Sequence, residues 1–443
     1  MSTPQLLLAG LLLLTLIAQA ALPSLRVLIV TSGAALSCLA VSLLGTGTTR
    51  QVMSEVPWEV LIILVGLGLL SELFVSSQLF GILAVRAARW SRARPKRLLV
   101  YFAVGMYLVS GLVNNLTALV LVLPVLLILL KLMGVHQRYV SWTLGVLLVA
   151  CNLGGAATPI GDFPAILLLS SGRMQFGEYL RYAAPPTLLA LILLLGVVVL
   201  VIQPQQGIER NAISAKLSVE IMQRMYRNVR LERRRFLPPA CLLALMLAGW
   251  TLLPQDSGVT AELVCWLGVA AALLISTQLG ERLIRTRVDI ESVFFLLSLF
   301  VMVGAVRRTG LFGSIAQTLT ALPMTPRSQL FVFLILSGLL TGIFSAGPSM
   351  AGLLEVAHSL ARHLPPHVVY VGLALSVCAG SSLLLTAATS GPMAQAITER
   401  AELQDSEGRP IQFDFSEFLP TGLVSFALIE LLALGYGWFF TGA

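Results

Sequence analysis

The chain has 443 residues, of which 57% are hydrophobic and only 11% are charged, whereas soluble domains carry about 25% charged residues. Apolar runs of about 20 residues, long enough to cross a hydrocarbon core of about 30 Å, recur along the whole chain. This composition excludes a sizeable soluble domain and predicts a polytopic membrane protein. The formal net charge of +8 comes mostly from two polar segments, so it indicates membrane orientation rather than nucleic-acid binding.

In the first half we expect spans at 5–21, 24–45 and 57–75. We interpret the first as a retained helix rather than a signal peptide, because no Lys or Arg precedes Arg26. The basic loop 86–97 follows, with six basic residues and no acidic one. Residues 98–133 are a long apolar piece interrupted by Asn114-Asn115, and two more spans are expected at about 141–170 and 178–202.

The stretch CNLGGAATPIGDFP, residues 151–164, lies inside one of these apolar segments. Its composition predicts a helix that breaks within the bilayer, at Gly154-Gly155 and Pro159. Hydrocarbon does not satisfy the backbone groups that a break frees, so broken helices persist only where protein buries them or where they line a polar cavity. Such interrupted segments are typical of the binding sites of transporters.

Residues 203–235 form the longest polar segment, with eight basic and three acidic residues. The pattern then restarts, with spans near 237–254, 259–280 and 288–307, a broken piece at 326–360, an interrupted segment at 368–396 and a last span at 418–440. We therefore divide the chain into a first transmembrane repeat (1–203), a basic linker (204–235) and a second repeat (236–443). The positive-inside rule places the linker and the 86–97 loop in the cytoplasm.

The two halves align with each other. Residues 56–59 match 288–291, 110–120 match 341–351, and 151–164 match 379–392. If each broken piece is a re-entrant hairpin, each half crosses the membrane five times, and an odd count makes the repeats inverted. We expect both termini on the outer side of a plasma membrane, such as a bacterial inner membrane.

The segment NLGGAATPIGDFP resembles a signature of the ion transporter superfamily, which includes arsenite permeases, NhaD-type sodium/proton antiporters, and citrate and dicarboxylate carriers. Residues 288–312 resemble its glycine-rich third helix, and residues 110–125 its hairpin. The resemblance implies alternating access, in which a hairpin-bearing transport domain moves against a scaffold, with a homodimer as an open possibility. Three features depart from the family pattern. Asn114-Asn115 replaces the Asp-Asn of many members, and Ala165 replaces the asparagine that follows the proline in many of them. Ser and Thr replace an Asn-Gly-Thr cluster in the second half.

The resemblance further implies that hairpin tips and interrupted helices meet near the midplane, where helix N-termini attract anions and free carbonyl and carboxamide oxygens hold Na⁺. The candidate residues of the first half-site are Asn114, Asn115, Thr117, Asn152, Gly154, Gly155 and Thr158. Those of the second half-site are Ser345, Ser349, Ser381, Ser382 and Thr386. The alternative is that these small residues only let helices pack closely and cap broken ends.

Acidic residues within a membrane are costly and are therefore functional candidates. Asp162 has no basic residue within ten positions; it either binds H⁺ or Na⁺, or caps the helix that resumes after it. Together with Asn115 and Asn152, it is a candidate Na⁺ ligand. Glu355 lies three residues before His358, so the two share a helix face and form a candidate proton relay.

These residues favour a secondary transporter, with Na⁺/H⁺-type cation antiport as the leading prediction. An anion permease for arsenite, dicarboxylate or a similar small solute is the alternative, which the helix N-termini and the Ser/Thr-rich second half favour. A membrane-embedded enzyme or passive scaffold is a third reading. We expect no enzyme and no cofactor, because the sequence has no HExxH, Walker or nucleotide-binding motif. The expected partners are a small ion or anion and the lipid bilayer, with Na⁺ or H⁺ as coupling ion.

Overall fold

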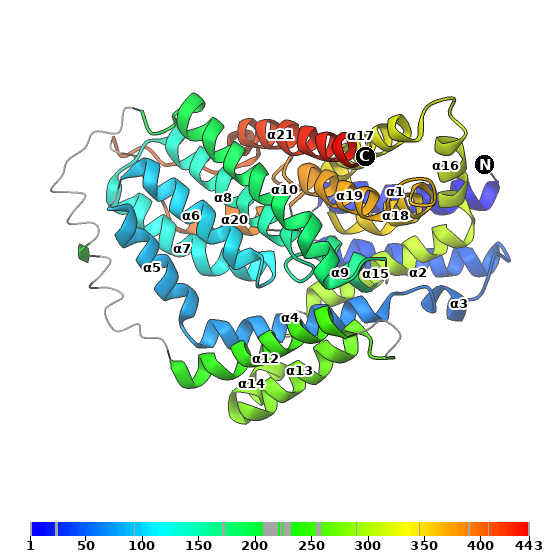
Figure 1. Cartoon of the computed structure of the whole chain (residues 1–443), viewed down its shortest axis with the longest axis horizontal. Helices are drawn as coiled ribbons and strands as arrows, with labels where there is room; N and C mark the ends of the chain where they lie inside the picture. The colour runs from blue at the N-terminus through cyan, green and yellow to red at the C-terminus, as the bar shows by residue number, and fades with distance from the viewer. Residues whose placement is uncertain are drawn as a thin grey trace.

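The computed structural model of the chain is built from helices (Figure 1), and it describes residues 2–22, 25–92, 94–170, 173–206, 220–221, 224, 232–253, 258–288, 290–344, 346–388, 390–405 and 407–441. In this part of the chain, the single β-type pairing is an isolated bridge between Gln404 and Pro410. Nine described helices are long and apolar enough to cross a membrane, or ten if one bent pair counts as a span. The predicted all-helical polytopic fold is therefore confirmed.

In the first half, the apolar piece 98–133 is two helices that are joined by a turn before Asn115, which we call the first hairpin. The interrupted segment that follows is a long helix, a break and a short helix. The elements of the first half are α1 (Thr3–Ala21), α2 (Arg26–Leu43), α3 (Thr49–Met53), α4 (Trp58–Ser76), α5 (Leu79–Ser91), α6 (Pro95–Ser110), α7 (Asn115–Met133), α8 (Gln137–Ala157), α9 (Phe163–Ser170), α10 (Phe176–Gly196) and the π-helical η2 (Val197–Ile202). Helix α5 covers the first part of the predicted 86–97 loop, so the loop itself is shorter than expected.

The second half follows the same order. Its elements are α12 (Arg233–Leu252), α13 (Ala261–Ile275), α14 (Thr277–Thr286), α15 (Ile290–Arg308), α16 (Leu311–Thr320), α17 (Pro326–Phe344), α18 (Ala346–Leu360), α19 (Pro366–Ser381), α20 (Gly391–Arg400) and α21 (Phe415–Thr441). The predicted span at 259–280 is instead two helices, α13 and α14, bent by 119°. The charged residues Glu281, Arg282 and Arg285 of α14 explain the bend, since they do not fit a straight path through hydrocarbon.

The two halves pack by the same scheme, and each seats its first helices on the other. Helices α1 and α2 pack against α15, whereas α12 and α13 pack against α4. Figure 1 shows α12, α13 and α14 gathered beside α4, with α6, α7, α8 and α20 lying together elsewhere. In each half, the helix before the break (α8 or α19) packs against the first hairpin helix (α6 or α17) and the last long helix (α10 or α21).

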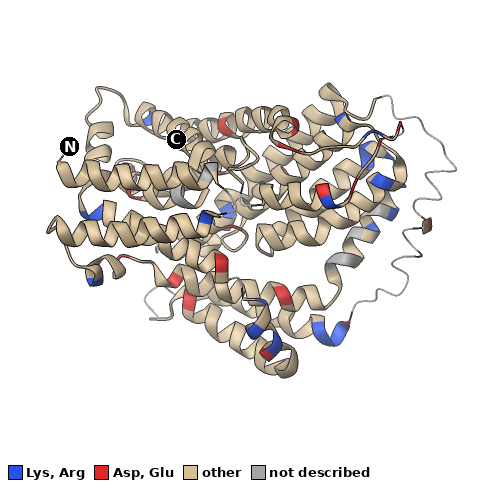
Figure 2. Ribbon diagram, turned by 180° about the vertical axis from the view of Figure 1, so that it is seen from behind, with Lys and Arg blue, Asp and Glu red and all other residues tan. Residues whose placement is uncertain are grey.

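Lys and Arg residues lie along one edge of the molecule, on α5, at the start of α6 and at the start of α12 (Figure 2). This edge contains residues of both segments that the positive-inside rule assigns to the cytoplasm. Most of the 204–235 linker lies outside the described residues, and α12 already begins at Arg233. The inversion of the repeats, the domain boundaries and the sidedness of the termini stay predictions.

Candidate functional site

Helix α8 runs without interruption through Gly154 and Gly155 and ends at Ala157, so the prediction that these glycines break the helix is wrong. Their role is close packing. A Cβ on Gly154 would collide with the carbonyl oxygen of Tyr107 in α6, and one on Gly155 would lie 2.8 Å from the Cβ of Asp162. The helical path is instead interrupted over residues 158–162, which include Pro159, and helix α9 begins after them.

The tip of the first hairpin lies directly against this break. Asn114 caps α7, since its side-chain oxygen accepts a hydrogen bond of 2.8 Å from the backbone N–H of Leu116. Asn115 is buried, and its Oδ1 lies within hydrogen-bond distance of the Ser110 hydroxyl, which also contacts the carbonyl oxygen of Cys151 at 2.7 Å. The Nδ2 of Asn115 has no hydrogen-bond partner among the described residues.

Asp162 stands at the start of α9 and is half-buried. Its Oδ1 accepts a hydrogen bond of 2.9 Å from the backbone N–H of Phe163. None of the ion pairs in the described ranges includes Asp162. The hydroxyl of Thr158 donates 2.7 Å to the carbonyl oxygen of Gly111, which fastens the break to the hairpin tip.

Asn152 joins the two halves of the candidate site. Its Nδ2 donates to the carbonyl oxygen of Ser381 at 3.2 Å and to the hydroxyl of Ser382 at 3.1 Å. All three residues are buried, so the ends of α8 and α19 meet inside the protein. Thr386, by contrast, is exposed and does not reach this contact.

The second hairpin contributes less than the sequence suggests. Ser345 lies outside the described residues, and Ser349 is buried, with a hydroxyl that has no partner within the described ranges. Glu355 lies 3.1 Å from Nη2 of Arg307, whereas His358 contacts Arg173 and the Tyr370 hydroxyl, both at 3.3 Å. Glu355 and His358 therefore have separate partners, so the geometry does not support the predicted proton relay.

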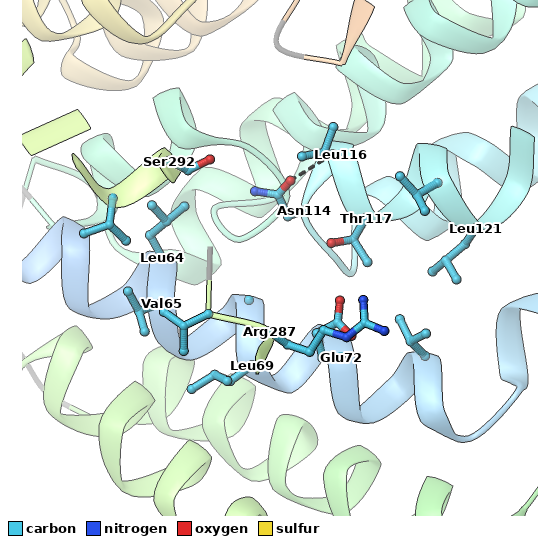
Figure 3. Close-up of a pocket in the computed structure, with 15 residues that line it drawn as sticks. Leu64, Val65, Leu69, Glu72, Asn114, Leu116, Thr117, Leu121, Arg287 and Ser292 are labelled. Carbon is cyan, nitrogen blue, oxygen red and sulfur yellow. Dashed lines mark hydrogen bonds and ion pairs between the residues drawn. The ribbon is translucent and has the colours of Figure 1, made fainter. Parts of the chain in front are cut away.

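A cavity of about 310 Å³ lies beside the tip of the first hairpin, between α4, the start of α7 and the junction of α14 and α15. Asn114 and Thr117 line it, so these two candidates face the cavity rather than Asp162. Glu72 and Arg287 also line it, with Nε of the arginine 3.9 Å from Oε2 of the glutamate. Figure 3 shows this pair across the cavity from Thr117.

The sequence reasoning missed Arg287 and left Glu430, an acid that it noted in the last span, out of the candidate site residues. Arg287 carries no local signal, because only the fold brings it to Glu72. Glu430 lies in the apolar last span and is buried; its Oε1 accepts a hydrogen bond of 3.1 Å from Ser376, while its Oε2 has no partner in the described part of the chain. An acid inside an apolar segment is the sequence signal that could have selected it.

Comparisons with known proteins agree with this architecture. An uncharacterized transporter of Mycobacterium tuberculosis is 26% identical over 390 residues, covering 86% of each chain. The magnetosome protein MamN of Magnetospirillum gryphiswaldense is 26% identical over 417 residues, covering 92% of this chain and 93% of its own.

The solved structure of the YdaH transporter of Alcanivorax borkumensis matches with a TM-score of 0.54 at 15% identity, covering 99% of this chain and 98% of that chain. At this identity the likeness concerns the fold alone. The sequence model of one family, described as "Citrate transporter", matches residues 11–380. The protein is thus a membrane transporter rather than an enzyme, and it belongs to the citrate transporter family.

Proposed function

We propose that this transporter exchanges Na⁺ for H⁺, with Asp162 as the ion-binding carboxylate. The observation that carries the proposal is the position of Asp162 at the break between α8 and α9, beside Asn115 and Gly155 and without a basic partner among the described residues. A carboxylate shielded from water is costly unless a proton or a cation neutralises it. Na⁺ and H⁺ compete for the same oxygens there, and such competition is what exchange requires.

The hydrogen bonds around Asn115 support a cation ligand at this place. The Ser110 hydroxyl has one proton but lies near two oxygens, those of Asn115 and Cys151. In this proposal the proton goes to the carbonyl oxygen of Cys151, which leaves Oδ1 of Asn115 for a cation. Both polar atoms of this carboxamide lie beside Gly155, next to Asp162. A carboxamide oxygen then lies near a carboxylate, and hard cations prefer such oxygen ligands.

The contact of Asn152 with Ser381 and Ser382 supports alternating access by both breaks together. Because one carboxamide bonds to the end of the opposite broken helix, a displacement of α8 is transmitted to α19. In this proposal the two broken helices and their hairpins move as one body. The side on which Asp162 is open would then alternate, and a cation leaves before a proton binds.

The test is cation-dependent proton movement in liposomes. The purified protein would be reconstituted with an imposed pH gradient and an interior pH dye, and Na⁺, Li⁺ and K⁺ would be added in turn. We expect Na⁺ to collapse the gradient with wild type and not with Asp162→Asn. Glu281→Gln is the matched control, because Glu281 is exposed and its one ion pair among the described residues is with Arg285 on the same helix. No response of wild type to any cation would overturn the proposal.

A small-anion carrier is a second candidate, for citrate, as the family description has it, or for another carboxylate or arsenite. The observation that favours it is the meeting of helix N-termini. Gly347, near the start of α18, lies against the ring of Phe163, the first residue of α9, and Asn115 begins α7 beside the same break. Helix N-termini attract anions. Saturable uptake of labelled citrate or arsenite by the same liposomes, with no cation-dependent proton flux, would favour this candidate.

A further inference from the structure

We propose that the cavity beside the first hairpin is a second cation site, at which Na⁺ binds Glu72 and replaces Arg287 as its counter-ion. This proposal builds on the cation exchange assigned above to Asp162. It gives the exchanged ion a binding site on the way to the helix break, where Glu72 and Arg287 join the sequence candidates Asn114 and Thr117.

The tip of the first hairpin lies between the cavity and Asp162. Asn114 and Thr117 line the cavity, whereas the next residue after Asn114, Asn115, lies against Gly155 and Asp162. A small displacement of this tip therefore connects the two places. The tip is attached to the break by the hydrogen bond from Thr158 to Gly111, so the connection depends on the movement that opens the break.

The ion pair in the cavity is loose and partly exposed. Its N–O distance of 3.9 Å is longer than a hydrogen bond. The side chain of Glu72 is 23% exposed and that of Arg287 is 63% exposed, so the carboxylate lies inside and the guanidinium lies toward the mouth. Ion pairs of this kind contribute little to stability, so a cation can replace the arginine at small cost. Between turnovers, Arg287 holds the carboxylate and keeps other cations off it.

The rest of the lining suits a cation better than an anion. Glu72 and Arg287 are its charged members, and the neutral oxygens come from Asn114, Thr117 and Ser292. Na⁺ with several waters fits, at about 30 Å³ per water in a space of about 310 Å³. An anion on Arg287 would instead lie next to the carboxylate of Glu72 and be repelled by it.

Gly68 provides a way to fill the cavity without damaging the helix. It lines the cavity, and a Cβ at this position would meet no atom within 4 Å. Gly105 in α6 is equally open but does not line the cavity. Gly68→Leu therefore blocks the space, and Gly105→Leu controls for the effect of a leucine on folding and insertion.

The decisive measurement is the stoichiometry of ²²Na⁺ bound to the full chain in lipid nanodiscs. We expect wild type to bind one more Na⁺ per chain than either Glu72→Gln or Asp162→Asn, and the double variant to bind none. Arg287→Gln should tighten the cavity site, while Gly105→Leu should bind as wild type does. Equal stoichiometry in wild type and Glu72→Gln would overturn the proposal, as would citrate binding that Arg287→Gln abolishes.

Flux measurements separate this proposal from the proposed exchange. In the liposome assay, Glu72→Gln should raise the Na⁺ concentration for half-maximal flux by roughly tenfold, because a charged ligand contributes at least that much to affinity. Gly68→Leu should lower the flux and Gly105→Leu should leave it unchanged. If wild type exchanges Na⁺ for H⁺ but both cavity variants behave as wild type, the cavity site is wrong and the exchange stands. If Na⁺ binds at both sites but is not exchanged for H⁺, the cavity site stands and the proposed exchange is wrong.

Discussion

The break after α8 and the break after α19 share a structural plan but differ in chemistry. Each is followed by a helix whose second residue is proline, Pro164 in α9 and Pro392 in α20. When the halves are aligned on these prolines, the carboxylate of Asp162 corresponds to the buried hydroxyl of Ser390. The break of the first half therefore carries an ionisable side chain, whereas the matching position of the second half carries a neutral one.

Packing, in contrast, is repeated between the two breaks. A Cβ on Gly154 would collide with the carbonyl oxygen of Tyr107, and a Cβ on Gly380 with that of Gly338. In both halves, a glycine thus lets the broken helix approach the backbone of the first hairpin helix. The comparison teaches that the repeat preserves close helix contacts, while the ionisable groups are placed independently in each half.

The largest effect should come from breaking the shared packing. Gly154→Leu and Gly380→Leu each force a side chain into a backbone carbonyl, which cannot move as a flexible side chain can. We expect each to destabilise the protein by about 3 kcal/mol or more. Thermal unfolding in detergent, followed by size-exclusion chromatography, measures this loss, with Gly105→Leu as control. A normal unfolding temperature for either variant would show that the two contacts are not equivalent.

The next prediction tests whether the carboxylate has to stand in the first half. Asp162→Ser should fold normally but lose cation-dependent flux. Adding Ser390→Asp moves the carboxylate to the matching position of the second half, at the start of α20 rather than of α9. The double variant should stay inactive in the liposome assay. Recovery of flux would mean that either break can hold the ion, which would contradict the chemical difference between the halves.

Glu430 marks a second difference, because the offset that places Glu178 on Glu417 puts the buried Leu191 at its position. One of its oxygens has no partner among the described residues, so Glu430 should be neutral in the folded protein. We therefore expect Glu430→Gln to change stability by less than about 0.5 kcal/mol, and Glu430→Ala to cost about 2 kcal/mol through the cavity that it leaves. Thermal unfolding of the two variants measures both. A large loss in Glu430→Gln would indicate an ionised carboxylate instead.

The smallest effect concerns the residues that precede the last long helix of each half, α21 and α10. The Oδ1 of Asp414 accepts hydrogen bonds from the Ser416 hydroxyl at 2.7 Å and the Glu417 N–H at 3.0 Å. These bonds hold the pKa of Asp414 below its usual range. The matching Gln175 makes no such cap on α10.

Because the folded-state pKa of Asp414 is lowered, its contribution to stability is complete above the unfolded pKa of about 3.9 and is lost as the pH falls through the folded pKa. Asp414→Asn should therefore flatten the decline of the unfolding temperature below about pH 4, and it should cost no more than about 1 kcal/mol at neutral pH. Gln175→Asp should bring a similar acid dependence to α10. An unchanged pH profile in Asp414→Asn would show that the cap does not contribute.

Local signals predicted the elements well and their contacts less well. Asn114-Asn115 and Pro164 mark a turn and a helix start that depend on neighbouring residues alone, and both lie where the sequence placed them. Gly154-Gly155 misled, because glycine permits a break but equally permits close helix packing. Which of the two occurs depends on Tyr107, which is distant in the sequence.

The acidic residues show the same limit. The spacing of Glu355 and His358 predicts a shared helix face, but each of them binds a charged residue from another element, Arg307 or Arg173. The pairing of Glu72 with Arg287 likewise arises only when the junction of α14 and α15 packs beside α4. The partners of these charged residues are therefore set by the fold and are not visible in the local sequence.

The two halves interlock, because α1 and α2 pack on α15 and α12 and α13 pack on α4. Neither half has its full set of neighbours without the other. Two polypeptides produced by a cut between the halves would therefore assemble when made together in one membrane, whereas each made alone would expose its apolar faces and be degraded. The apolar packing of each half is thus completed only by the other half.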